Sequence, residues 1–394
     1  MQKNNSFILW LPSWYPNQLS PYAGDFIQRH ATAVSSFIPI HVLCFVRDKK
    51  KRITDSIHIE ENRSGNLTET IVYYSATNSS IVVFDKFFSD QKFTKLYKKI
   101  VPELFQKNGK PLLVHVHVAF KAGMIAGWIR KKYKIPFFLS EHWTIYLDGA
   151  RPNLKDLNFM ARYFISKSIT RALKIFVVSD YLGKEIQKRW SSINFKVIPN
   201  VVNIDIFYPA ENANPDEICR LVHISDLNYQ KDPERLFEAM GILKRKGIKF
   251  SLDVFGPFDE YINSLVIKEE IEQVVRFHKE IPQSLLAEHI RKSDALILYS
   301  RYETFGCVII EANACGIPAI VTDTPLMHEL VTDGKNGMLV RVESSKALAE
   351  ALENFFNNRD QFNKEIIAGS ARRYSYQEIG RMFFEEYVPF TNST

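Results

Sequence analysis

Residues 293–321 read SDALILYSRYETFGCVIIEANACGIPAIV, and the order of their apolar and polar segments indicates the class of fold. Its opening run, SDALILYS, predicts a buried strand, and a polar loop follows the carboxyl end of that strand. A short helical segment, 306–315, then ends where Gly316 and Pro318 supply the usual stop signal. The stretch closes with another apolar run. A strand, a loop, a helix and a second strand in this order predict a unit of a parallel sheet.

The loop before this helix is suited to an anion. Thr304, Phe305, Gly306 and Cys307 present backbone N–H groups at the helix start, where the helix dipole also favours negative charge. The glycine lets a ligand approach the backbone closely. In open α/β sheets ligands bind beyond the carboxyl ends of the strands, which is where this loop lies. A diphosphate is therefore the expected ligand.

Two glutamates flank this anion site at an E-x7-E spacing. Glu303 lies in the loop, and Glu311 lies one turn beyond Cys307 on the same helix face. A carboxylate can accept hydrogen bonds from two vicinal hydroxyls, such as those of a ribose. One anion site between two hydroxyl acceptors predicts a nucleotide-sugar. The alternative is a helix start with solvated glutamates, but a glutamate within so apolar a helix would be costly to bury without a role.

Short apolar runs alternate with helical patterns along the whole chain. Strands are expected in the first half at 7–11, 40–45, 112–117, 137–140, 175–179 and 196–198. They are expected in the second half at 220–224, 251–255, 274–277, 295–299, 319–321 and 337–340. A polar, proline-containing stretch, 208–217, separates the halves. In a chain of 394 residues, this pattern predicts two α/β, Rossmann-like domains whose parallel sheets face a cleft.

Composition excludes several other classes of protein. Hydrophobic residues make up 46% and charged residues 24% of the chain, as in a globular protein. No apolar run approaches the roughly 20 residues of a bilayer-spanning helix, and the first apolar run is too short for a signal peptide. We therefore expect a cytoplasmic protein. The four cysteines have no C-x-x-C spacing and are expected to be reduced core residues.

The net charge of +7 leans towards the first 135 residues. It is compatible with a phosphate-bearing substrate or an anionic membrane surface. Nucleic-acid binding would rest on charge alone and is not expected. A dehydrogenase is disfavoured, because no G-x-G-x-x-G motif follows a strand.

The stretch SRYETFGCVIIEANACGIPAIVTD resembles the E-x7-E signature of the retaining glycosyltransferases of the GT-B fold, family 4 (glycosyltransferase group 1). The resemblance runs through nearly the whole chain, including VVSDYLGKEI, FKVIPN, LVHISDLNYQKDPERLFEAM and ARRYSYQEIGRMFFEEY. It implies an acceptor-binding N-terminal domain, 1–205, and a donor-binding C-terminal domain, 206–372. A C-terminal helix, 373–394, is expected to return to the N-terminal domain.

The resemblance selects further site residues. Lys231 aligns with the family's donor-phosphate lysine, and Gly24 resembles its glycine loop near the diphosphate. His142 matches a histidine near the transferred sugar, where it would bind the sugar or the reacting hydroxyl. Glu303 and His142 are thus the expected catalytic residues, beside the donor-binding set Gly24, Lys231, Thr304, Phe305, Gly306, Cys307 and Glu311.

No cofactor beyond a UDP- or GDP-linked sugar is implied, and no metal is expected. His115 and His117 share one face of a strand, but two histidines without a third ligand are a weak metal signal. We interpret them as strand-end residues, with His117 near the cleft.

The chain departs from the family pattern at two places. Ser225-Asp226 stands where a Gly-Arg pair is common, so either another cation supplies the second phosphate ligand or Asp226 serves acceptor recognition. Pro325-Leu326 replaces a glycine pair that normally borders the donor sugar, while Glu329 keeps its place. The donor sugar is therefore left open.

The implied reaction is retaining transfer of a hexose-type sugar from a nucleotide diphosphate-sugar to a hydroxyl of a glycan. Such a reaction belongs to cell-surface polysaccharide or glycoconjugate synthesis. Two alternatives stay open, a nucleotide-sugar epimerase of the same fold and a non-catalytic, nucleotide-sugar-binding assembly protein. A glycan phosphorylase would need a cofactor-lysine motif that is not found.

The acceptor depends on the segment 84–105, which mixes aromatic residues with lysines. As an amphipathic helix it would either lie on an anionic membrane surface or pack against the protein. The first option predicts a peripheral protein on the inner face of the membrane and a lipid-linked glycan as acceptor.

Overall fold

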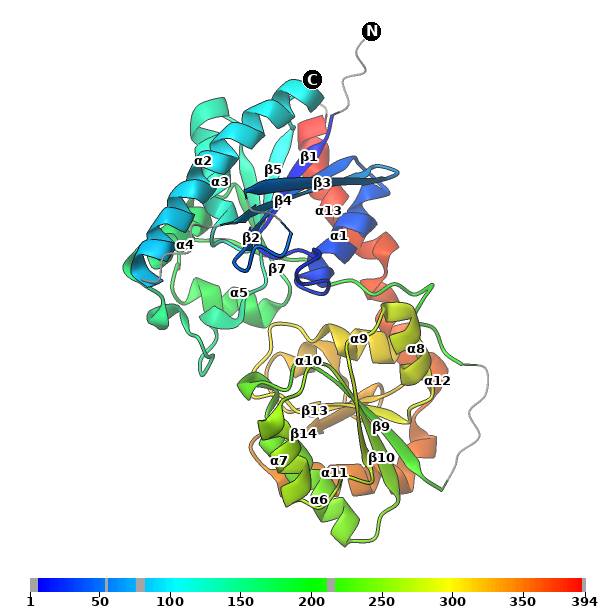
Figure 1. The fold of residues 1–394 in the computed structure, drawn as a ribbon. Helices are drawn as coiled ribbons and strands as arrows, with labels where there is room; N and C mark the ends of the chain where they lie inside the picture. Colours follow the sequence, from blue (N-terminus) through cyan, green and yellow to red (C-terminus); the bar gives the residue numbers. More distant parts are fainter. Residues whose placement is uncertain (1–5, 54–55, 76–81, 211–216, 392–394) are drawn as a thin grey trace.

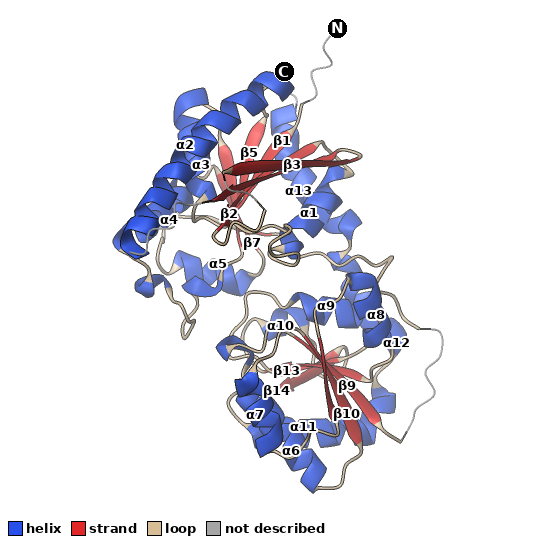
Figure 2. Cartoon of the chain, viewed as in Figure 1, coloured by secondary structure: helices blue, strands red, loops and turns tan. Residues whose placement is uncertain are grey.

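Two sheets flanked by helices form two halves stacked one above the other (Figures 1 and 2). This computed structural model describes residues 6–53, 56–75, 82–210 and 217–391. The first sheet uses strands up to Val197, and the second begins at Cys219. The predicted pair of α/β units is confirmed.

The first sheet has eight strands in the order β3-β4-β2-β1-β5-β6-β7-β8. They are β1 (Ile8–Pro12), β2 (Ile40–Asp48), β3 (Ile57–Ser64), β4 (Leu67–Ser75), β5 (Leu113–His117), β6 (Phe137–Glu141), β7 (Lys174–Val177) and β8 (Lys196–Val197). All neighbours pair in parallel except β3 and β4, which are antiparallel. Strands β1, β5 and β6 are buried along their whole length, because helices cover both faces.

The hairpin formed by β3 and β4 is a feature that the strand predictions miss. Every residue of β3 is exposed or half-buried, and after Ile57 and Ile59 its sequence has no further apolar residue. Gly65 makes the turn with a φ of 57°, a conformation that glycine adopts easily. Only β4, which is mostly buried against β2, carries an apolar run, and its threonines and glutamate conceal it.

The helices of the first half are α1 (Asp25–Ser35), α2 (Val82–Asn108), α3 (Ala122–Tyr133), α4 (Phe159–Arg171) and α5 (Asp180–Gln187), with the short η1 (Thr144–Tyr146) and η2 (Leu154–Asp156). Helix α2 decides between the two interpretations of the aromatic segment 84–105. Its Phe93, Leu96 and Tyr97 are buried in the core. The packed alternative is therefore correct for these residues, while the side chains of Phe84, Phe87 and Phe88 lie outside the described ones.

The second sheet has six parallel strands in the order β11-β10-β9-β12-β13-β14. They are β9 (Cys219–Ile224), β10 (Phe250–Phe255), β11 (Val275–His278), β12 (Ala295–Leu298), β13 (Ala319–Thr322) and β14 (Gly337–Val340). The order reverses between β9 and β12, and such a reversal is where open α/β sheets bind ligands.

The second half is covered by helices α6 (Pro233–Arg245), α7 (Glu260–Lys268), α8 (Gln283–Arg291), α9 (Cys307–Ala314), α10 (Met327–Leu330), α11 (Ser345–Asn358) and α12 (Lys364–Ala371), with η3 (Tyr229–Lys231), η4 (Arg359–Gln361) and η5 (Arg372–Tyr374). Within the described ranges, none of these helices or those of the first half combines the length and apolarity that crossing a bilayer requires.

The last helix, α13 (Tyr376–Thr391), leaves the second half and packs beside α1 of the first (Figure 1). Its Ile379, Phe383 and Tyr387 are buried in the first half's core. Gly380 permits the close approach, because a Cβ atom there would lie 2.6 Å from the backbone oxygen of Ala33. The expected return of the C-terminal helix is confirmed.

We predict that Gly380→Ala lowers the free energy of unfolding by about 1–3 kcal/mol, because the added methyl group forces α13 away from α1. Gly369→Ala in α12 is the matched control, since nothing lies within 4 Å of its added Cβ. Helix propensity alone should raise stability there by up to about 1 kcal/mol. Urea unfolding of both variants checks this, and equal stabilisation by both would contradict the packing described.

Candidate active site

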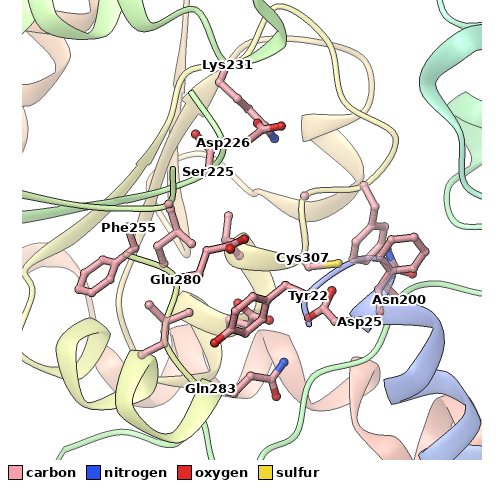
Figure 3. A pocket seen from close by; sticks show the side chains of 18 of the residues that line it. Tyr22, Asp25, Asn200, Ser225, Asp226, Lys231, Phe255, Glu280, Gln283 and Cys307 are labelled. Atoms are coloured by element: carbon pink, nitrogen blue, oxygen red, sulfur yellow. The ribbon is translucent and has the colours of Figure 1, made fainter. Parts of the chain in front are cut away.

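A cavity of ≈ 420 Å³ opens between the two halves. Figure 3 shows Lys231, Asp226 and Ser225 at one end and Gln283 at the other, with Tyr22 and Asp25 entering from the first half. Its volume lies within the range of small-molecule sites. Of the predicted site residues, those lining it are His142, Lys231, Glu303, Thr304, Phe305, Gly306, Cys307 and Glu311.

The start of α9 faces this cavity as an uncapped helix end. Gly306 is its N-cap residue, with φ 91° and ψ 65°, and no side chain caps the helix. A side chain at this position would be strained, so glycine keeps the backbone open to the cavity. Uncapped N–H groups and the positive end of the helix dipole suit an anion. The geometry thus agrees with the predicted anion site.

Glu303 is buried in the loop between β12 and α9. It forms an ion pair with Lys231 of η3 and accepts hydrogen bonds from Gln230 Nε2 at 3.0 Å and Ser300 Oγ at 2.9 Å. Two loops that follow neighbouring strands, β9 and β12, therefore meet at one carboxylate. Lys231, which the resemblance selects as a phosphate ligand, thus lies against Glu303, and the two side chains neutralise each other's charge.

Glu311 is paired across the cavity with Arg29 of α1. Arg29 also binds Asp25 at 2.7 Å, one turn earlier on its own helix. Burial raises the pKa of Glu311, and the Arg29 guanidinium opposes that rise. Burial alone would lower the pKa of Arg29, but Glu311 and Asp25 raise it above its ordinary value. This ion pair therefore joins the two halves at the site.

His142 follows β6 and is buried between the rings of Phe26, 4.9 Å away, and His117, 5.7 Å away. Burial lowers its pKa well below 6.5, and the neighbouring His30 and His115 lower it further. The ring is therefore neutral near pH 7. Its buried Nδ1 has no hydrogen-bond partner among the described residues, so a ligand in the cavity could provide one.

Glu141 holds the loop that carries His142. Its carboxylate accepts the backbone N–H groups of Ala119, His142 and Trp143 at 2.9–3.1 Å, and the Tyr146 hydroxyl at 2.9 Å. Burial raises the pKa of Glu141, while these donors lower it. It therefore holds the backbone of this loop and does not line the cavity itself.

Two of the residues singled out in the sequence, Gly24 and Glu329, lie elsewhere than expected. Gly24 does not line the cavity; it begins α1, and a Cβ there would lie 2.6 Å from the backbone oxygen of Trp14. Glu329 accepts the N–H groups that begin α5, at Asp180 and Tyr181, at 2.9 and 2.8 Å. Cys307 lines the cavity, but burial raises the pKa of its thiol to about 12, so it is no nucleophile.

Sequence reasoning missed Arg29 and the apolar wall of the cavity. The only local signal for Arg29 was its i,i+4 spacing from Asp25, which is an ordinary surface pattern on helices. The wall comes from strand ends and loops that are distant in sequence, at Ile224, Phe255, Pro257, Ile281 and Leu286. Within the part of the chain that is described, no three His, Cys, Asp or Glu side chains are grouped to hold a metal ion.

Two family models match the chain. Residues 206–373 match the model described as Glycosyl transferases group 1, and residues 70–206 match Glycosyltransferase Family 4. An uncharacterized glycosyltransferase of Methanocaldococcus jannaschii is 27% identical over 250 residues. That alignment covers 63% of this chain and 66% of the relative, slightly under two thirds of its length.

Solved structures share the fold over almost the whole chain. Sucrose-phosphate synthase from Thermosynechococcus elongatus superposes with a TM-score of 0.77 at 17% identity, covering 99% of this chain and 100% of that one. Anabaena HepE, solved in complex with UDP and glucose, superposes with a TM-score of 0.70 at 15% identity, covering 98% and 100%. The expected GT-B fold is confirmed.

We predict that Arg29→Met destabilises the protein more at pH 8 than at pH 5. Without its cation, buried Glu311 holds a proton in the native state at pH values where the unfolded state has released it. The free energy of unfolding then falls as the pH rises from the ordinary glutamate pKa of 4.5 towards the raised native pKa. Breaking a buried pair costs about 3–5 kcal/mol near neutral pH.

Urea unfolding at both pH values measures this effect. Glu311→Gln added to Arg29→Met should restore part of the loss at pH 8, because no buried charge then remains. Arg162→Met, at an exposed position, is the control. An equal loss at both pH values would mean that Glu311 does not depend on Arg29.

Proposed function

Because this chain belongs to the group 1 glycosyltransferases, family 4, we propose that it moves a hexose-type sugar from a nucleotide diphosphate-sugar to a glycan hydroxyl with retention of configuration. One observation carries the proposal. The uncapped start of α9 faces the cavity between two buried carboxylates, Glu303 and Glu311. An anion site between two hydroxyl acceptors fits a nucleotide-sugar and fits few other small molecules.

The donor would lie along the cavity in a defined order. Its diphosphate would bind the N–H groups at the start of α9, and its ribose hydroxyls would bind Glu311. The base would rest on the apolar wall that includes Phe255, Pro257 and Ile281. The sugar would then lie beside Glu303, near His142.

The charged residues that line the cavity support a change of ion-pair partners when the donor binds. Its lining has two cations, Lys231 and Arg29, and five carboxylates, Asp25, Asp226, Glu280, Glu303 and Glu311. Both cations are paired with the glutamates that would accept hydroxyls. Hydroxyls of the donor would replace the cations at these two glutamates. The released cations would then contact the diphosphate. Arg29 would thus be the second phosphate ligand, in place of the arginine that Asp226 replaces.

The reaction would break the bond between the anomeric carbon and the phosphate oxygen, and it would form a bond from that carbon to the acceptor oxygen on the same face. The acceptor proton would pass to the departing phosphate oxygen. Lys231, Arg29 and the α9 dipole would stabilise the charge that develops on the nucleoside diphosphate. Neutral His142 would hold a sugar or acceptor hydroxyl through its free Nδ1.

We propose that no metal takes part, since these cations and the helix start supply the positive charge. Transfer should therefore persist in EDTA. The acceptor we propose is a lipid-linked glycan of a cell-surface polysaccharide or glycoconjugate pathway, with the enzyme peripheral to the membrane. The aromatic residues of α2 that the structure describes give this no support, because they are buried.

Two other functions make different demands. An epimerase would change the free nucleotide-sugar without an acceptor. A non-catalytic assembly protein would bind the donor without ever breaking it, and the departures at Asp226 and Pro325 keep that alternative in view. Slow hydrolysis of the donor in the absence of acceptor would exclude it.

We predict that Glu303→Ala lowers the rate of transfer by at least about 10²-fold, because the sugar loses its hydroxyl acceptor and Lys231 its partner. The fold should survive, since the carboxylate lies in a loop. Glu288→Ala, at an exposed position on α8, is the control. Nucleotide release measures the rate, and an unchanged turnover in Glu303→Ala would remove the residue from the mechanism.

We predict that one of UDP-, GDP- and ADP-sugars stabilises the protein against heat, by about 2.7 kcal/mol at 100 times its Kd. The same donor should release nucleotide slowly in water and faster with acceptor, with or without EDTA. Thermal unfolding and nucleotide release are scored on the same panel. Stabilisation by none of the donors would contradict a nucleotide-sugar site.

A further inference from the structure

The first turn of α4 exposes three large apolar side chains within five residues. Phe159 is 71% exposed, Met160 56% and Tyr163 45%. We call these three residues the α4 tip. Exposed apolar residues such as Ile366 on α12 occur singly and are normal on protein surfaces. A contiguous group of them marks a surface that contacts something apolar.

The opposite face of α4 fixes the orientation of this tip. Ala161, Ile165 and Ile169 are buried against the first half. The Asn158 side chain caps the helix by accepting the N–H of Ala161 at 2.9 Å. The tip is therefore held in a regular helix, with its side chains on the outward face.

The sequence on either side of the tip is rich in cations and poor in carboxylates. Residues 149–173 contain one carboxylate, Asp156, and five cations, Arg151, Lys155, Arg162, Lys167 and Arg171. Asp156 is engaged locally, accepting the N–H of Asn153 at 2.8 Å. Within the described chain, the three cations of α4 itself form no ion pair with a carboxylate. Lys167 Nζ lies 5.4 Å from the centre of the Tyr163 ring, so charge adjoins the apolar surface.

The positive surface continues onto the neighbouring helix. Helix α3 packs beside α4 and has no acidic residue. Its Arg130 Nη1 donates to the backbone oxygen of Arg171 at 2.7 Å, and Lys131 and Lys132 follow it, exposed. Figure 1 shows α3 and α4 on the same side of the first half as α2.

One loop connects the α4 tip to the rim of the cavity. The chain runs from His142 through this loop to Phe159. On the way, Arg151 stacks on Tyr229 at 3.9 Å, and its N–H donates to the Tyr302 hydroxyl at 3.0 Å, beside Glu303. The loop that leads to the tip therefore contacts the second half near the cavity.

We propose that the α4 tip and its surrounding cations bind an anionic lipid bilayer. Phe159, Met160 and Tyr163 would enter the boundary between headgroups and acyl chains, and the cations would contact lipid phosphates. A second copy of the chain is a poorer occupant, because a symmetric contact would place the five cations of each copy against those of the other. The proposal deepens the proposed function by naming the surface that presents a lipid-borne acceptor, but binding itself requires no sugar transfer.

Sedimentation with vesicles tests the proposal on the full chain. Vesicles of phosphatidylcholine with phosphatidylglycerol should bind the protein at low salt and release most of it at high salt. Pure phosphatidylcholine should bind little. Phe159→Ser with Met160→Ser should lower the affinity at least about tenfold, because burying both side chains provides the apolar part of binding. Arg162→Gln with Lys167→Gln should also weaken binding, mainly at low salt.

Matched controls lie on the second half. Ile366→Ser removes a side chain that is 60% exposed, and Lys268→Gln with Lys346→Gln removes two exposed cations. Both control variants should bind the anionic vesicles as tightly as the unchanged protein. Phe159→Trp should shift its fluorescence to the blue with anionic vesicles, whereas Ile366→Trp should not.

The proposal would be overturned if the tip variant bound vesicles as tightly as the unchanged protein. It would also be overturned if the unchanged protein did not bind them. A tip variant that alters only the oligomeric state in gel filtration would overturn it too, because the tip would then be a contact between copies. Donor hydrolysis should be the same in the tip variant and the unchanged protein. That measurement separates a failure of this proposal from a failure of the proposed reaction.

Discussion

Glu311 lies buried on α9, and its cation, Arg29, comes from α1 across the cavity. A buried carboxylate is costly without a partner, so this pair constrains how the two halves face each other. Other contacts between the halves also hold them in this arrangement. Glu329 accepts the first N–H groups of α5, and the Ser179 hydroxyl donates to the backbone oxygen of Thr304 at 2.8 Å. The shape of the site therefore depends on polar contacts between the halves, and one of them, the pair of Arg29 with Glu311, lies where a ligand could replace it.

This arrangement has a consequence for selectivity. A nucleoside could take the place of Arg29 on Glu311, but it would leave the guanidinium with Asp25 as its one remaining carboxylate partner. Inorganic diphosphate could satisfy both cations, but it would leave Glu311 buried without its Arg29 donor and Glu303 with only Gln230 and Ser300. The ligand that we propose, with hydroxyls on both sides of a diphosphate, would satisfy all four groups at once. The two ion pairs would thus disfavour fragments of this proposed donor more than the donor itself.

The parts of this fold that sequence predicted well are those with dense local signals. The stretch from β12 to β13 carries a buried strand, a glycine N-cap and a Gly-x-Pro stop within one unit, and the structure has each of them. The β3–β4 hairpin has no such signals, because β3 is solvated on both faces. Arg29 could not be assigned from sequence either. Its role depends on a contact 282 positions along the chain, which no helical periodicity records.

The same limit explains why aromatic and basic composition pointed to α2, whereas the exposed apolar surface lies on α4. Both helices mix aromatic residues with lysine or arginine, so their compositions do not separate them. What separates them is packing: Phe93, Leu96 and Tyr97 of α2 face the core, but Phe159 and Tyr163 of α4 face outward. A helix presents to a membrane only what its neighbours leave uncovered. Amphipathic patterns therefore identify a surface only after the fold has determined which face is buried.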